Sequence, residues 1–199
     1  INTSNCVSLP EISFSEGTLT MLNVSGCTAL SSISVSKNQL QTINITGCKA
    51  LKNLNCEDNR LSSLSTADAT ELESLRCASN LLAQLDLRTN TKIKNLWCNS
   101  NQITSINAQN CTDLGSITCS NNIISQLVLT NCSGLYSLSI EHNQLFGSAT
   151  ASIMNALPDR TGKSNGIMNF TGNSGYNSAL ETAVNKKWTV NGGTWTKDE

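Results

Sequence analysis

Cysteine has the widest chemical range of any residue type in this sequence, because a thiolate binds metals, attacks electrophiles and forms disulfides. Its nine copies fall into two series separated by multiples of 21 residues: Cys56, Cys77, Cys98 and Cys119 in one, and Cys6, Cys27, Cys48, Cys111 and Cys132 in the other. No CxxC pair or Cys/His cluster is present, so a metal site is not favoured. Copies stacked in register point their Cβ atoms in parallel, which disfavours disulfides. We therefore expect nine reduced and buried thiols that act as small apolar side chains with a weak S–H donor.

The other candidates for catalysis are isolated from one another. His142 is the only histidine, and no nucleophile is paired with it in the pattern of a catalytic triad. The GxGxxG and P-loop patterns are absent, and the adjacent Glu57 and Asp58 are typical of a solvated edge. N-x-S/T triplets, which also mark glycosylation sites, are interpreted as products of Asn/Ser/Thr-rich turns at Asn23, Asn44, Asn110 and Asn131. We expect no enzyme activity, no metal and no cofactor.

The composition narrows the possible partners. Charged residues make up 14% of the chain, against roughly 25% in an ordinary soluble domain. The net charge is −1 and no basic run occurs, so nucleic acid is not an expected partner. No apolar run is long enough for membrane insertion. The opening residues, INTSNCVSLP, do not have the pattern of a signal peptide.

One asparagine recurs every 21 residues without a slip, at Asn38, Asn59, Asn80, Asn101, Asn122 and Asn143. Apolar residues hold fixed positions around each copy, for example Leu51, Leu54 and Leu61 around Asn59. An earlier copy keeps the apolar positions, including Phe14, but has Gly17 in place of asparagine. The chain therefore contains seven copies of a 21-residue repeat that reads LxxLxCxxNxLxxLxLxxCxx.

This repeat resembles the leucine-rich repeat, in which LxxLxLxxN forms one short parallel strand followed by a turn. Alternate residues of the strand point inward, and the asparagine satisfies backbone groups at the turn. The second half of each copy echoes the first, as in Leu85, Leu87 and Asn90, and is too short for a helix. The pattern resembles the nested bacterial subfamily called IRREKO. We expect a leucine-rich-repeat solenoid with a parallel β-sheet on the concave face and an extended or short-stranded convex side.

The ends of the chain depart from the repeat, as solenoid caps do. We expect a partial N-terminal repeat over 1–8, seven repeats over 9–147 and a C-terminal cap over 148–199 with two short helices. The first helix should bury Ile153, Met154 and Leu157 and stop at Pro158. The second, roughly 177–187, should turn Leu180, Ala183 and Val184 inward, and Trp188 and Trp195 should cover the last strand.

The outward face of the strands is mostly small and polar, with one exception. Its central positions are Ser13, Ser34, Asn55, Arg76, Trp97, Thr118 and Ser139. An indole in the middle of such a face, one strand from Arg76, is typical of an interface anchor. The alternative is a local cation–π pair without a ligand. We take the candidate ligand-binding residues to be Trp97, Arg76, Asn55, Thr118, Asn95 and Asn99.

The sequence favours a non-enzymatic binding or adhesion module that contacts protein or glycan through the concave strand face. The alternative is a structural spacer in a larger surface protein. The resemblance to bacterial leucine-rich-repeat proteins implies secretion or display at the cell surface. We expect a monomer.

Overall fold

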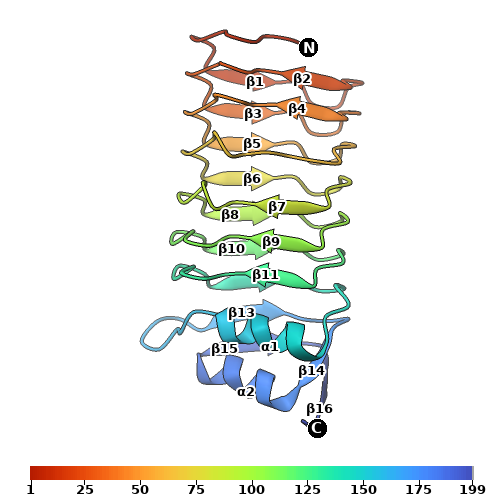
Figure 1. Ribbon diagram of the computed structural model, residues 1–199, viewed down its shortest axis with the longest axis vertical. Coiled ribbons are helices and arrows are strands. Elements are labelled where there is room, and N and C mark those ends of the chain that lie inside the picture. Colours follow the sequence, from red (N-terminus) through yellow and green to blue (C-terminus); the bar gives the residue numbers. More distant parts are fainter. Residues whose placement is uncertain (199) are drawn as a thin grey trace.

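The computed structural model describes residues 1–198 and shows a nearly straight stack of short coils (Figure 1). One parallel sheet of nine strands runs the length of the stack, and its outer surface is the concave face named above. In spatial order its strands are β1 (Glu11–Ser13), β3 (Ser32–Ser34), β5 (Asn53–Asn55), β6 (Ser74–Arg76), β8 (Asn95–Trp97), β10 (Ser116–Thr118), β12 (Ser137–Ser139), β13 (Gly166–Asn169) and β15 (Trp188–Asn191). Leu54 pairs with Leu75, and Leu75 with Leu96, so the register advances by one repeat per strand.

Within the seven repeats the convex side carries two smaller parallel sheets, as the echo in the second half of the repeat predicts. One pairs β2 (Met21–Asn23) with β4 (Thr42–Asn44). The other joins β7 (Gln84–Asp86), β9 (Ser105–Asn107) and β11 (Gln126–Val128). Between β4 and β7 the corresponding segment, 62–65, forms no strand, so the convex side is interrupted at one repeat.

A single apolar core fills the space between the two sides. Leucine and isoleucine occupy most inward positions of the repeats, and most of them are almost completely buried, as are the four cysteines that directly follow the concave strands. Burial of a leucine-sized side chain contributes about 1.5–3 kcal/mol. Since each repeat contacts its neighbours, the core is continuous from the first repeat to the C-terminal helices.

The recurring asparagine closes the turn after each concave strand. In Asn80 the Nδ2 atom donates to the carbonyl oxygens of Cys56 (2.9 Å), Cys77 (3.2 Å) and Ala78 (3.1 Å). Its Oδ1 atom accepts from the backbone amide of Leu61 at 2.9 Å. One side chain thus ties two successive repeats together, which confirms its predicted role at the turn.

The C-terminal region continues the stack with inserted helices. Helix α1 (Gly147–Ala156) follows the seventh repeat, and α2 (Asn177–Asn185) lies between β14 (Ser174–Tyr176) and β15. Strand β16 (Thr194–Thr196) pairs with β14 on the convex side. None of the helices within residues 1–198 has the length and apolar character needed to cross a bilayer.

Most of the expected packing of this region is confirmed. Ile153, Met154 and Leu157 are buried, and so is Trp188, whose indole donates to the carbonyl of Pro158 at 2.9 Å. Trp195 stacks on Phe170 with ring centroids 5.2 Å apart. The prediction for Val184 was wrong. Its side chain is 51% exposed because α2 turns its small face, Ala179 and Ala183, toward the core.

The first residues pair with strand β2. The amino group of Ile1 donates to the carbonyl of Met21 at 2.8 Å, and the amide of Thr3 to that of Asn23 at 2.9 Å. Two expectations fail here, because Phe14 is 49% exposed and the Cys6 thiol is also exposed. Both residues are the first at their repeat position, so a neighbouring coil packs against them on one side only.

Candidate binding face

The concave face brings the central candidate residues together. Arg76 pairs with Asn55 on one neighbouring strand and with Trp97 on the other, and Trp97 pairs with Thr118. Alternation along a strand points these four side chains away from the core, in one row across β5, β6, β8 and β10. The sequence therefore predicted this row correctly, although its role in ligand binding stays a prediction.

Arg76 and Trp97 form a stacked pair. The guanidinium carbon of Arg76 lies 4.1 Å from the centroid of the Trp97 ring. Glu57, which was not among the candidates, extends the pair, since its carboxylate lies 3.7 Å from Arg76 Nη1. The Arg76 side chain is 44% exposed, so neither contact contributes more than about 1 kcal/mol. These contacts orient the three side chains but are too weak to fix their conformations.

Trp97 is half-buried rather than fully exposed. The guanidinium covers one face of its ring, and Thr118 occupies the neighbouring strand on the other side. Within residues 1–198 its indole nitrogen has no hydrogen-bond partner. The stack therefore presents the edge of an indole and an N–H donor to any partner of this face.

The candidate asparagines differ in whether their side chains already make hydrogen bonds within the protein. The side-chain oxygen of Asn55 accepts from the Glu57 amide at 3.1 Å, so this residue is partly committed to its own turn. Asn95 lies at the start of β8, and Asn99 lies just beyond its end; both are half-buried. Among residues 1–198 only the backbone carbonyl of Asn99 is hydrogen-bonded, to the Ser79 amide at 2.9 Å and to Asn101 Nδ2 at 3.3 Å, so its side chain is available.

The structure adds two exposed apolar residues to this face that the sequence did not single out. Tyr136 and Ile167 are each 50% exposed, and Ile167 pairs with Ser137, the residue after Tyr136. Gly115 lies one repeat before Tyr136, where a Cβ atom would approach the tyrosine ring to 2.6 Å. In the sequence, the one sign of the exposed tyrosine was Gly115, which holds the same repeat position as Tyr136 one repeat earlier.

The cysteines are structural in two different ways. The turn thiols donate to the carbonyl 24 residues earlier, as in Cys48 to Val24 (3.2 Å) and Cys132 to Ala108 (3.1 Å). The four strand cysteines (Cys56, Cys77, Cys98 and Cys119) are completely buried. Burial raises the pKa of the Cys56 thiol to about 12 and that of Cys98 well above its usual value. All nine thiols are free, and a thiol with such a raised pKa is a poor nucleophile.

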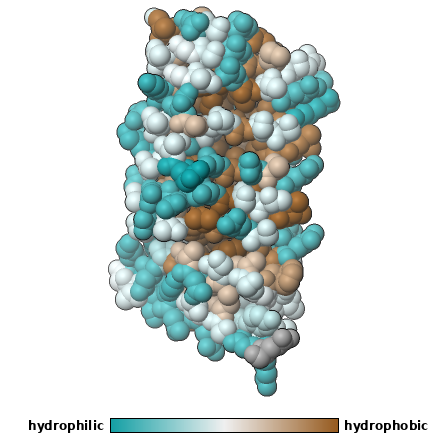
Figure 2. Space-filling view, in the orientation of Figure 1, coloured by the Kyte–Doolittle hydropathy of each residue, from teal (hydrophilic) through white to brown (hydrophobic). Residues whose placement is uncertain are grey.

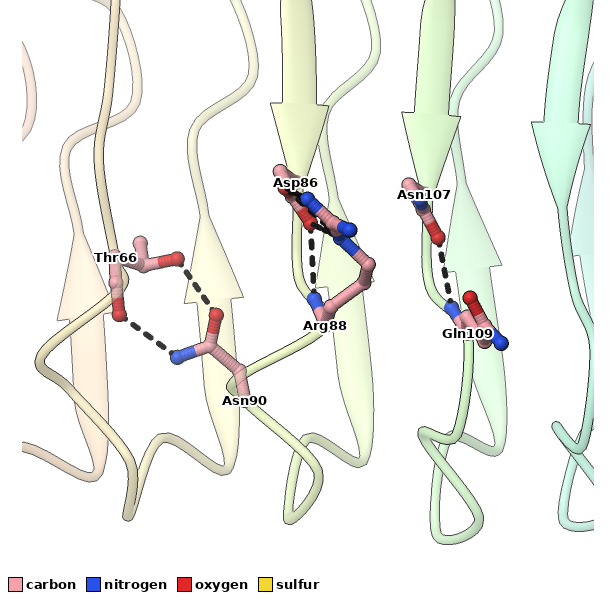
Figure 3. A network of polar contacts seen from close by, with 6 residues as sticks. All are labelled: Thr66, Asp86, Arg88, Asn90, Asn107 and Gln109. Carbon is pink, nitrogen blue, oxygen red and sulfur yellow. Dashed lines mark hydrogen bonds and ion pairs between the residues drawn. The ribbon is translucent and has the colours of Figure 1, made fainter.

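Asn90 replaces cysteine in one copy of the turn and keeps the same bond. Its Nδ2 donates to the carbonyl of Thr66, again 24 residues earlier, at 2.9 Å (Figure 3). Its Oδ1 accepts from the Thr66 hydroxyl at 2.7 Å. The residue is completely buried, so these bonds satisfy an amide that would otherwise be costly.

Comparison with known proteins confirms the leucine-rich-repeat solenoid fold. The functional domain of InlJ from Listeria monocytogenes, which includes a cysteine ladder, is 21% identical with a TM-score of 0.60. That alignment covers 90% of this chain and 43% of the other, so this chain spans less than half of the InlJ domain. No protein-family model matches the sequence. No curated protein matches it either.

Two further structures align over most of the chain with lower scores. The plant peptide hormone receptor RGFR1 in complex with RGF2 has 14% identity and a TM-score of 0.43, over 92% of this chain and 43% of that one. An internalin, inlF, from Listeria monocytogenes has 14% identity and a TM-score of 0.31, over 96% and 83%. The conclusion about the fold rests on InlJ alone.

Proposed function

We propose that this chain is a non-enzymatic binding module whose concave face contacts a protein or glycan ligand, centred on Trp97. The observation that carries the proposal is the stack of Arg76 on Trp97, extended by the Glu57 carboxylate and held by three successive repeats of a mostly small and polar surface. Indole and guanidinium side chains dominate the binding energy of known interfaces. A sheet of nine strands in fixed register also holds the backbone of these residues in place, which lowers the entropic cost of binding.

The surroundings of the stack support the same role. Thr118, Asn95 and Asn99 offer hydrogen bonds beside the indole, and Tyr136 and Ile167 offer apolar contact farther along the face. The likeness to InlJ, a domain of a Listeria protein, is consistent with a bacterial surface or secreted protein of the nested-repeat type. We propose that location and repeat type for this chain, and a monomeric state.

Trp97→Ala tests the proposal against surface glycans and cell-surface proteins extracted from candidate partners. Removal of the indole should weaken binding by about 2 kcal/mol or more, and the melting temperature should change little because the side chain is outside the core. Ser139→Ala, on the same outward column two strands from Trp97, serves as the matched control.

The alternative, a structural spacer, predicts that the wild type retains no ligand. A purely structural role for Trp97 predicts a lower melting temperature with unchanged binding. Normal binding by Trp97→Ala to a ligand held by the wild type would exclude the concave-face site.

A further inference from the structure

The convex side departs from the repeat at two successive turns. The residue before each of the five turn cysteines takes a positive φ, and all five are residue types that tolerate it: Asn5, Gly26, Gly47, Asn110 and Asn131. Asp68 and Thr89 hold the same position and do not adopt it. A β-branched residue such as Thr89 is strained in that conformation, so these turns follow another path.

The altered turns interrupt the convex sheet. Segment 62–66 makes no backbone hydrogen bond with β4 or β7, whereas β9, the equivalent segment two repeats later, pairs with a strand on each side. The Asp68 carboxylate accepts from the Gly47 amide at 2.9 Å, where the regular repeat uses a carbonyl. Ile43 and Leu64, which face the interruption, are only partly buried.

A groove lies at this interruption and runs on over the neighbouring strands. A hollow of about 460 Å³ is lined by Leu64, Thr66, Gln84, Asp86 and Arg88, among others. A second, of about 240 Å³, shares Gln84 and Asp86 with it and continues over β9 and β11. Helix α1 packs against β11 beyond it. In Figure 2 apolar surface is visible along the middle of this side of the molecule, between polar rims.

The charged groups in the groove neutralise one another. Arg88 folds back onto Asp86, with Nη2 at 2.7 Å from Oδ2 and Nε at 3.0 Å from Oδ1 (Figure 3). The carboxylate also accepts from the Arg88 amide at 3.1 Å. An ionic ligand would therefore find no unpaired charge of opposite sign in the groove.

The uncharged polar side chains are unoccupied. Within residues 1–198, the side chains of Gln84, Ser105 and Gln126 have no hydrogen-bond partner, and Asn107 uses only its oxygen, which accepts from the Gln109 amide at 3.1 Å. Each amide offers both donors and an acceptor. Leu64 and Val128, which are partly exposed, supply the apolar floor of the groove.

We propose that this convex groove binds a neutral, hydroxyl-rich oligosaccharide. Adjacent sugar hydroxyls both donate and accept, which matches the amides of Gln84 and Gln126, and the C–H faces of the rings fit the apolar floor. The occupant spans several strands, because the amides recur once per repeat along the groove. A peptide added as a strand to β7 fits less well, since segment 62–66 already lies beside that edge.

Binding to an array of neutral oligosaccharides, acidic oligosaccharides and extended peptides tests this site, with titration calorimetry on the strongest neutral ligand. Gln84→Ala and Gln126→Ala should each weaken that binding at least tenfold. Both side chains are exposed and unpaired, so folding should be unaffected. Gln102→Ala, an exposed glutamine that does not line the groove, is the matched control, and Trp97→Ala should bind as the wild type does.

The opposite results are equally clear. The site is excluded if neutral oligosaccharides do not bind, if only acidic glycans or peptides bind, or if Gln84→Ala binds normally. Loss of binding in Trp97→Ala, with Gln84→Ala unaffected, would move the oligosaccharide to the concave face. The proposal for the groove and the proposal for the concave face can therefore be excluded independently of each other.

Discussion

The asparagine of each repeat and the turn cysteine have the same role at two different turns, which is to donate a hydrogen bond to a backbone carbonyl. Both side chains donate to the carbonyl 24 residues earlier, as Asn80 does to Cys56 and Cys48 does to Val24. A bending chain leaves such carbonyls without a partner, and a buried polar group without a partner is costly. The amide is the stronger donor, and Asn90 shows that it also fits the cysteine position.

Asn101→Ala should therefore lower the free energy of unfolding by about 1–3 kcal/mol, because it leaves buried backbone groups unpaired. The Asn101 side chain donates to the carbonyls of Cys77 (3.0 Å) and Cys98 (3.1 Å), and accepts from the Leu82 amide (2.9 Å). Asn99→Ala is the matched control and should stay within about 0.5 kcal/mol. Urea titration measures both, and equal losses would show that the side-chain bonds of Asn101 do not stabilise the turn.

At the scale of the element, the strand cysteines form a column inside the core. Each of the four directly follows a concave strand, Val35 and Ile140 hold the same repeat position before and after them, and all six residues are completely buried. Burial disfavours the thiolate and raises the pKa of each thiol, to about 12 for Cys56. These buried thiols should therefore make the free energy of unfolding fall at alkaline pH.

The folded state keeps these thiols protonated at pH values where the unfolded chain loses the protons. Above the unfolded pKa of about 8.5, the free energy of unfolding should fall by up to about 1.4 kcal/mol per pH unit for each buried thiol. The contribution is fully present below that pKa and is lost as the pH rises toward the folded value. Cys98→Val should remove one thiol's share of the slope in urea titrations under reductant. Stability that does not change between about pH 8 and pH 10 would contradict the burial of these thiols.

The sequence predicted the elements well where the repeat is regular and less well where it is not. Period, strand register, asparagine turns and both helices followed from residue spacing. The exposure of Phe14 and Val184 did not, because it depends on which neighbours cover a position. The positive φ of the residue before each asparagine, as in Ser79 and Ser100, has no residue preference that reveals it. Thr89, in a position otherwise favouring glycine and asparagine, was the available sign of the convex interruption.

At the scale of the whole molecule, the candidate binding row was predictable because it needs only the alternation of a strand. Glu57 was missed since its approach to Arg76 depends on side-chain conformation. Tyr136 and the convex groove were missed because they arise from packing between repeats. Each coil of a solenoid contacts only its neighbours, so one altered pair of turns is not corrected by distant contacts.

The two sides of the molecule should therefore differ in local stability at the interruption. The concave sheet is continuous through β5, β6 and β8, whereas segment 62–66 lacks the backbone partners that 104–108 possess. An amide without an acceptor exchanges with solvent without waiting for the structure to open. In hydrogen-exchange mass spectrometry, peptides covering 62–66 should exchange at least about tenfold faster than peptides covering 104–108. Concave peptides covering 53–55 and 95–97 should both be slow and serve as internal controls. Equal protection of 62–66 and 104–108 would show that the convex sheet closes in solution, and the groove would then lack the opening on which it depends.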